Sequence, residues 1–541
     1  MNLNERDGSG MGETTQRIVV DGGSRHHAAG DAPQALSQDQ RRFLLATASS
    51  TCALIVLDTN VVAVSLPSIA RSFHAGFADV EWVVSAYMVA FASCLLPMGG
   101  LSDRYGRKKM MLVGLAVFAL ASLGCGVAPS AVLLDVARAV KGVGAAMLLT
   151  AALAVIASAF PQPSERARAW AVWGMTMGVA TTVAPLVGGA ITQWIGWRWI
   201  FLLNVPVCAV LAGCALRCVA ESRNPGAGPT DVAGSALFAG GLALGIWALI
   251  SSQNDGWTSL QTWLRVAACA LSLGCFIRIE RRRAHPMIDL SLFAQPKFVA
   301  AVLAMFGYAG CAQVMMTFLP LYLQNAFGWS AIDAGMGMLP FAVAMIGGPH
   351  VGSRLVSRLS GFALLAVGLA LVGAGNLSTA LAAAYGHYAV VAVGMVVTGL
   401  GAGMLNGETQ KAIIGCVPDS RTGMASGIST TTRFTAIVMS VGVLGSVLSW
   451  RAQSSLDGQL RAAPELRPWA GPGFMSDLLA GDIAHASARV LPELRPALEH
   501  IAAASFASGF IAALVFAGLA ALWIAVTVRW LSTPRGVDSG S

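Results

Sequence analysis

Long apolar runs constrain this chain more than any other feature of its sequence. A helix needs about 20 apolar residues to cross the hydrocarbon core of a membrane, which is roughly 30 Å thick. Charged residues make up only 11% of the chain, compared with about 25% in a soluble domain. The sequence therefore predicts an all-α integral membrane protein and argues against a soluble helical one. We expect about fourteen spans, near residues 43–67, 80–99, 110–128, 131–159, 169–192, 197–219, 231–251, 260–279, 298–324, 331–349, 360–382, 388–407, 425–449 and 505–528.

The loops between these runs alternate in charge. Cytoplasmic loops of membrane proteins carry an excess of Lys and Arg, so we expect both termini in the cytoplasm. The Ala- and Gly-rich composition suggests a bacterial source, and we expect the chain in the inner membrane. The formal net charge of +8 then reflects loops that face anionic membrane lipids, and it requires no nucleic-acid partner. The basic loops hold Arg166, Arg168, Arg217, Arg223, Arg278, Arg281, Arg282, Arg283, Arg354, Arg358, Lys411 and Arg421.

A compact charged turn, Leu-Ser-Asp-Arg-Tyr-Gly-Arg-Lys-Lys at residues 101–109, separates the second and third runs. A glycine at Gly106 allows so short a turn to close. A similar segment at residues 353–361 favours two related helical bundles around a central cavity. The two copies lie further apart than six helices require, so we expect two extra helices inserted between the bundles.

These observations predict a simple organisation for the chain. Most of the ten cysteines lie inside apolar runs at neither disulfide nor metal-ligand spacing, so we expect them to be packing residues. We expect no metal and no cofactor. Leucines near residues 491–498 suggest a short amphipathic helix on the membrane surface or over the transport path, with a plain solvated loop as the alternative. The expected segments are a disordered cytoplasmic tail (1–42), an N-terminal six-helix bundle (43–219), two inserted linker helices (220–285), the C-terminal bundle helices (286–449), an external loop (450–504), and the last transmembrane helix with a cytoplasmic tail (505–541).

An acid inside the first run, Asp58, is the leading candidate for a functional residue. A carboxylate in the hydrocarbon zone must face a wet cavity, pair with a cation or hold a proton. A conformational change that alters its burial or its distance from a cation can load and release that proton. The alternative is a neutral Asp58 that is hydrogen-bonded to Thr59, to Asn60 or to a neighbouring backbone group.

The fourth run places Asp135, Arg138 and Lys141 at three-residue spacing, and therefore along one helix face. Arg138 cannot lose its charge and needs an acceptor. Asp58 on another helix is the natural partner, whereas an Asp135–Arg138 pair of purely architectural role is the alternative. Gly142 and Gly144 follow on the next turn and allow a close helix contact.

The fifth run contains a candidate hinge at Pro185, Gly188 and Gly189. Proline removes a backbone hydrogen bond and the glycines remove side-chain bulk, so the helix can bend and a neighbour can approach. Candidate cavity-lining residues are Trp173, Tyr308 and Gln313, because aromatic faces suit organic cations. Ordinary packing is the alternative role for these residues.

Taken together, these motifs resemble the major facilitator superfamily, and in particular its drug:proton antiporter branch with fourteen spans. The similar stretches are Leu57 to Pro67, Gly99 to Lys109, Arg138 with Gly142 and Gly144, Pro185 to Gly189, Trp197 to Pro206, Leu321 to Gln324 and Arg421 to Gly427. The resemblance implies two six-helix bundles plus two inserted helices and proton-driven export of amphipathic or cationic compounds. It also implies Asp58 and Arg138 as proton-coupling residues, and a conformational latch of Gly99, Asp103, Arg104, Gly106 and Arg107.

Several positions depart from the pattern of that branch. The family usually has Gly where Ala184 stands, Gln where Lys141 stands, and Thr and Asn where Asn60 and Ala63 stand. Ala184 makes the bend at the following proline stiffer. Lys141 adds a charge that can repel cationic substrates or change the proton affinity of Asp58.

The leading interpretation is a proton-coupled antiporter that exports drug-like compounds by alternating access, with small-molecule substrates, protons and membrane lipids as partners. No Gly-x-x-x-x-Gly-Lys-Ser/Thr loop for ATP occurs. The alternative is a proton-coupled importer of a small metabolite on the same fold, against which the antiporter-like proline and glycines argue. An enzyme is disfavoured, because the chain has neither His-Glu-x-x-His nor Gly-x-Ser-x-Gly. No pattern bears on a periplasmic adaptor.

Overall fold

The computed structural model describes residues 37–533, apart from residues 161, 224–230, 284–288, 314, 357, 419–421, 471–473, 475–477 and 480–489. These described residues form helices and loops, and they include no strand. Most of the tail expected at residues 1–42 lies outside the described residues, and its last five residues already belong to the first helix.

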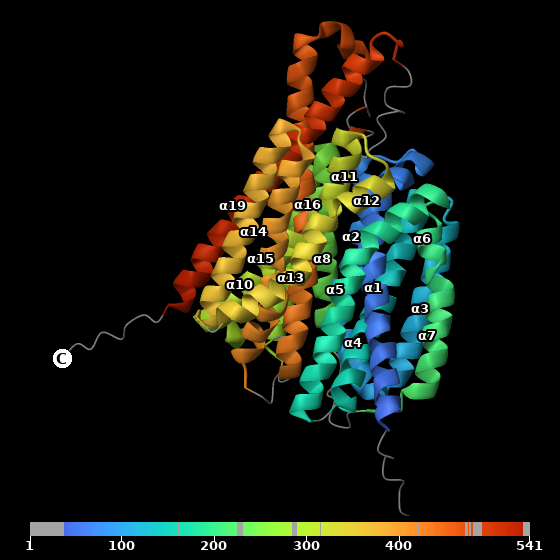
Figure 1. The fold of residues 1–541 in the computed structure, drawn as a ribbon, viewed down its shortest axis with the longest axis vertical. Helices are drawn as coiled ribbons and strands as arrows, with labels where there is room; N and C mark the ends of the chain where they lie inside the picture. The colour runs from blue at the N-terminus through green and yellow to red at the C-terminus, as the bar shows by residue number, and fades with distance from the viewer. Residues whose placement is uncertain are drawn as a thin grey trace, which may run out of the picture.

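The N-terminal half forms one group of helices (Figure 1). A capping box starts its first helix, since the Gln40 N–H donates to Ser37 Oγ at 3.2 Å and the Ser37 N–H donates to Gln40 Oε1 at 2.9 Å. Pro97 bends the second helix by 53°. The group consists of α1 (Gln38–Phe73), α2 (Phe77–Tyr105), α3 (Arg107–Val127), α4 (Ala131–Ala159), α5 (Pro163–Trp194), α6 (Trp199–Leu202) and α7 (Asn204–Cys218).

Two further helices and a second group follow. The first of them, α8, packs against α2 and α16 and so lies between the groups, whereas α9 packs against α8. The remaining elements are α8 (Val232–Asp255), α9 (Leu260–Glu280), η1 (Leu290–Ala294), α10 (Pro296–Tyr308), a π-turn η2 (Ala309–Gln313), α11 (Met315–Phe327), α12 (Ala331–Gly337), α13 (Leu339–Val356), α14 (Gly361–Tyr385), α15 (Tyr388–Gly415), α16 (Thr422–Ala462), η4 (Pro464–Trp469) and α19 (Arg495–Ser532).

The helices have the length and composition of membrane spans. Within the described residues 13 helices can cross a membrane, and the number rises to 14 when the bent α2 is taken as one span. Several spans join two elements, such as α6 with α7 and α10 with α11. The predicted all-α membrane fold with about fourteen spans is therefore confirmed.

We name the two ends of the bundle by α1: it begins at the inner end and finishes at the outer end. The last helix, α19, finishes at the inner end too, so the described chain starts and stops on the same side (Figure 1). The charged turn at 101–109 also lies at the inner end, between α2 and α3.

Two helices project far beyond the other spans at the outer end. α16 has 41 residues and α19 has 38, although about 20 suffice to cross a membrane. Their extensions pack side by side above the bundle (Figure 1). Leu456 and Leu498 are buried there. Residues 450–504, expected to form an external loop, thus contain the continuations of both helices, and Leu498 contributes to their packing.

Two hydrogen bonds join the two groups of helices in the outer half of the molecule. Gln324 Nε2 on α11 donates to the carbonyl of Val64 on α1 at 3.1 Å. The N–H of Ile332 on α12 donates to Gln193 Oε1 on α5 at 3.5 Å. These residues lie near the outer ends of their helices, so the molecule is closed on that side.

Candidate functional site

A buried ionic cluster lies in the N-terminal group of helices. Asp58 is 4% exposed, and both of its carboxylate oxygens accept hydrogen bonds. Oδ2 accepts from Arg138 Nη1 at 2.8 Å. Oδ1 accepts from Lys141 Nζ and, at 3.0 Å, from Asn204 Nδ2. We call these four residues the Asp58 cluster; its members come from α1, α4 and α7.

The geometry of α4 explains why two cations reach one carboxylate. Residues three apart share a helix face, so Arg138 and Lys141 both point toward α1. Small residues let the neighbouring helices come close. A Cβ atom on Gly144 would lie 2.9 Å from the backbone nitrogen of Phe118 on α3, and one on Gly142 would collide with the backbone of α2. The close packing predicted for these glycines is thus present.

Polar and aromatic groups hold the two cations in place. Arg138 Nε donates to the Val83 carbonyl at 2.9 Å, and the guanidinium lies 4.1 Å from the centre of the Tyr87 ring. Lys141 Nζ lies 4.7 Å from the centre of the Phe118 ring and 4.8 Å from that of Phe201. Such cation–π contacts stabilise a cation away from water. Arg138 and Lys141 are each 0% exposed, so the cluster is sealed from solvent in this structure.

The structure brings Asp58 and Arg138 together, as the sequence indicated. Asp135, the alternative partner of Arg138, takes part in none of the ion pairs seen in the described residues. The sequence also indicated Lys141, but only as a charged residue at a position where the family usually has Gln. Asn204 was part of a recognised stretch without an assigned role, and no sequence signal pointed to the carbonyl of Val83.

The proposed latch contains a tight turn at Gly106, which has a φ of +116°. Asp103 accepts from Arg107 Nε at 3.2 Å and from Nη2 at 2.9 Å. A residue that no sequence pattern indicated, Glu221, completes this turn. The carboxylate of Glu221, which follows α7, accepts from the N–H groups of Lys108 and Lys109 at 3.2 Å each. It therefore caps the N-terminus of α3.

Replacing Glu221 with Ala should loosen this turn. The free energy of local opening at the start of α3 should fall by about 1 kcal/mol, as for other lost helix caps, which corresponds to about fivefold faster amide exchange. Hydrogen exchange of the peptide that contains Lys108 and Lys109 measures the effect. Glu493→Ala, at an exposed glutamate, is the control; equal exchange in both variants would exclude the capping role.

The other two latch residues lie apart from this network. Arg104 is exposed and lies 5.6 Å from the centre of the neighbouring Tyr105 ring. Gly99 faces α4, where a Cβ atom would lie 3.9 Å from the methyl group of Thr150. Arg104 is therefore free to meet other groups at the inner surface, while Gly99 provides space between α2 and α4.

The candidate hinge packs against one helix of each group, α1 of its own group and α12 of the second. A Cβ atom on Gly188 would lie 2.9 Å from the Val61 carbonyl oxygen on α1. One on Gly189 would lie 2.5 Å from the carbonyl oxygen of Ala331 on α12. Pro185 lies one turn earlier within the continuous helix α5. The glycines thus permit close approach of backbones at the outer end.

The candidate cavity-lining residues have different surroundings. Trp173 is half-buried and its ring centre lies 5.5 Å from that of Trp170. Tyr308 is 0% exposed; its hydroxyl donates to Asn406 Oδ1 at 3.1 Å and accepts from Arg433 Nη2 at 3.4 Å. Gln313 belongs to the π-turn η2, and its side chain lies outside the described part of the chain.

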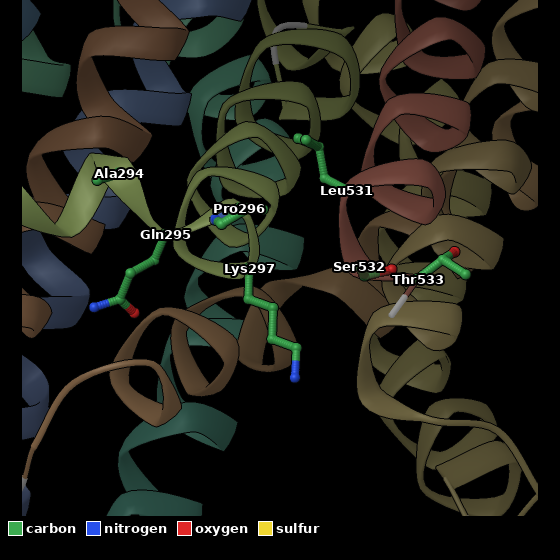
Figure 2. A pocket seen from close by; sticks show the side chains of 7 residues that line it. All are labelled: Ala294, Gln295, Pro296, Lys297, Leu531, Ser532 and Thr533. Carbon is green, nitrogen blue, oxygen red and sulfur yellow. The ribbon is translucent and has the colours of Figure 1, made fainter. Parts of the chain in front are cut away.

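A separate hollow of about 410 Å³ opens at the inner ends of α10 and α19 (Figure 2). Pro296 and Lys297 line it on one side, and Ser532 and Thr533 on the other. It lies at the surface and shares no residue with the Asp58 cluster. The hollow is therefore not part of the site formed by the buried cluster.

Comparison with known proteins places the chain among membrane transporters. Residues 48–441 match the model of the Major Facilitator Superfamily. Multidrug resistance protein Stp of Mycobacterium tuberculosis is 32% identical over 414 residues, which cover 76% of this chain and 77% of that protein. Multidrug efflux pump LfrA of Mycolicibacterium smegmatis is 32% identical over 422 residues, covering 76% and 82%. A solved structure of a bacterial homologue of the human lysosomal transporter Spinster, in an inward-facing and occupied conformation, is similar in fold with a TM-score of 0.64, at 17% identity over 92% of this chain and 98% of that one.

Proposed function

Because this chain belongs to the Major Facilitator Superfamily, we propose that it exports drug-like amphipathic or cationic compounds across the cytoplasmic membrane in exchange for inward-moving protons. Its relatives carry the names of multidrug resistance and efflux proteins. These names favour export over the alternative of metabolite import. They also support a transporter rather than an enzyme.

The observation that carries the proton-coupling part of the proposal is the Asp58 cluster. Ionisable groups inside a membrane protein are costly and typically mark ion or proton pathways. Asp58 lies on α1, and the same helix contacts the second group of helices through the Val64 carbonyl, which accepts from Gln324 on α11. A change of protonation in the cluster can therefore act on the contact that closes the outer side.

The arrangement of the helices supports alternating access with the inner end facing the cytoplasm. Basic loops gather at the inner end, as the positive-inside rule requires of cytoplasmic loops. In this orientation the start of α1 and the end of α19 lie on the cytoplasmic side. A proton that moves inward through 100 mV releases about 2.3 kcal/mol, which is available to drive export. The latch at Asp103 and Arg107 and the hinge at Gly188 and Gly189 would accompany the transition.

The test is energy-dependent efflux of ethidium, a lipophilic cation, from cells that express wild type or Asp58→Asn at matched levels. We expect the wild type to lower cellular ethidium in a manner that a protonophore abolishes, and the variant to have lost this activity. Asp457→Asn, at an exposed carboxylate of the outer extension, should behave as wild type. Protonophore-sensitive efflux by Asp58→Asn would remove Asp58 from the coupling site, and ethidium accumulation by the wild type would favour import.

A further inference from the structure

Lys141 is a buried titratable group. The proposed coupling role of Asp58 and Arg138 does not assign it a function. Its side chain is 0% exposed and its ammonium group contacts Asp58 Oδ1. The rings of Phe118 and Phe201 lie on its other sides. No second carboxylate pairs with it among the described ion pairs. Among the described residues, the carboxylate that pairs with Lys141 is therefore Asp58, which also pairs with Arg138.

The charges of the cluster do not balance when all three groups are ionised. One carboxylate and two cations give a formal net charge of +1 in a site closed to water. Further titratable groups surround it, and in the part of the chain that the structure describes none of them is a cation. Those that interact with the cluster or line it are Asp135 on α4, one turn toward the outer end, Tyr87 on α2, Cys125 on α3 and Cys208 on α7.

A proton can be exchanged either at Asp58 or at Lys141, and the two exchanges differ in free energy. If Asp58 takes up a proton, Arg138 and Lys141 remain as two buried cations without their shared counter-charge, which is strongly destabilising. If Lys141 releases a proton, Asp58 and Arg138 remain as a neutral pair, and the amine of Lys141 can still donate a hydrogen bond to Asp58 Oδ1. Arginine does not release a proton in proteins, whereas a buried lysine does so readily. Exchange at Lys141 is therefore the less costly of the two.

We propose that Lys141 carries the exchanged proton, while Asp58 and Arg138 stay ionised as a fixed pair. The proposal rests on the proton-coupled function argued above and assigns its proton to one atom. An N–H bond of the ammonium group breaks, the amine keeps the electron pair, and the proton passes to water when the cluster opens toward the inner end. On the outer side the same electron pair takes a proton from water.

The position of Lys141 also links this exchange to the movement of helices. A hydrogen bond between two ionised groups is about twice as strong as one between neutral groups, so loss of the proton weakens the tie between α4 and α1. Val61 and Val64, which contact α5 and α11 at the outer end, follow Asp58 by three and six residues on α1. A looser α1 can shift at this contact.

The protonation state of Lys141 can be observed directly, because the chain has only five lysines, Lys108, Lys109, Lys141, Lys297 and Lys411. Purified protein labelled with ¹³C-lysine is titrated in detergent micelles, and Lys141→Gln identifies its signal. We expect one buried lysine signal to change reversibly between the ammonium and the amine form within the range of pH at which the protein transports. A Lys141 signal that stays in one form throughout that range would overturn the proposal.

Transport by two variants separates a proton carrier from a fixed counter-charge. In proteoliposomes that contain ethidium, Lys141→Arg keeps the charge and Lys141→Gln keeps a hydrogen-bond donor, but neither can exchange a proton. We expect both to lose uptake driven by a pH gradient while they retain exchange of ethidium for ethidium. Lys297→Gln, at an exposed lysine on α10, controls for loss of one positive charge.

The outcomes distinguish this inference from the proposed function. If Lys141→Arg retains pH-driven uptake, the residue serves as a counter-charge and the inference is wrong, although the protein remains proton-coupled. If Lys141→Gln retains it, the proton lies on another group of the cluster. If the wild type exchanges ethidium without any response to a pH gradient, the proton-coupled function itself fails, and with it the assignment of its proton.

Discussion

Asp58→Asn lowers the free energy of unfolding by about 3–5 kcal/mol, because it removes the carboxylate that pairs with two buried cations, Arg138 and Lys141. Arg138 cannot lose its charge and is 0% exposed. The amide that replaces the carboxylate keeps one accepting oxygen instead of two and carries no charge to neutralise the cations. Much of this loss is the cost of an uncompensated charge rather than of the missing contacts.

A double-mutant cycle tests that explanation. Adding Arg138→Gln to Asp58→Asn removes the one of the two cations that cannot release its proton, so we expect the double variant to be more stable than the sum of the two single effects predicts. Unfolding by a denaturing detergent, followed by tryptophan fluorescence, measures all four proteins. Asp457→Asn should leave stability unchanged. Effects that simply add would show that the two side chains do not form an energetically coupled pair.

The fold was predictable from the sequence because lipid imposes a length on every span. The same rule could not show how far the last two spans extend. α16 continues through Arg451, Asp457 and Arg461 to Ala462, and a polar continuation outside the membrane has no apolar signal. The extension follows instead from packing between α16 and α19, which buries leucines such as Leu456 and Leu498.

The centre of the candidate site was also predictable, because a charged side chain inside the membrane requires a group of opposite charge nearby. Asp58 and Arg138 were identified in this way. The way in which Lys141 and Asn204 share one carboxylate oxygen depends on the relative positions of α1, α4 and α7, which no local pattern encodes. Glu221 was invisible for a related reason: it is a surface acid whose role depends on its contact with the start of α3.

Gly189→Leu should hold the outer side open and abolish net transport. A Cβ atom at this position would lie 2.5 Å from the Ala331 carbonyl oxygen and 2.9 Å from the Ile332 Cα atom. These are backbone atoms of α12, which cannot rotate away as a flexible side chain can. Overpacking of this kind costs about 1–3 kcal/mol, and a cost borne only by the outward-closed state shifts its population about 5- to 150-fold.

Accessibility from outside reveals this shift independently of transport. In a background without the ten native cysteines, Gln324→Cys places a thiol where the structure joins α11 to Val64 of α1. We expect a membrane-impermeant maleimide to label it faster from outside when Gly189→Leu is added. Gly213→Leu on α7 is the matched control, because a Cβ atom there meets nothing within 4 Å. Equal labelling rates with and without Gly189→Leu, together with normal transport, would show that the close approach of α5 and α12 does not close the outer side. Faster labelling together with lost transport would show that the contact between α5 and α12 closes the outer side. The size of the side chain at position 189 would then determine whether the protein can close on that side.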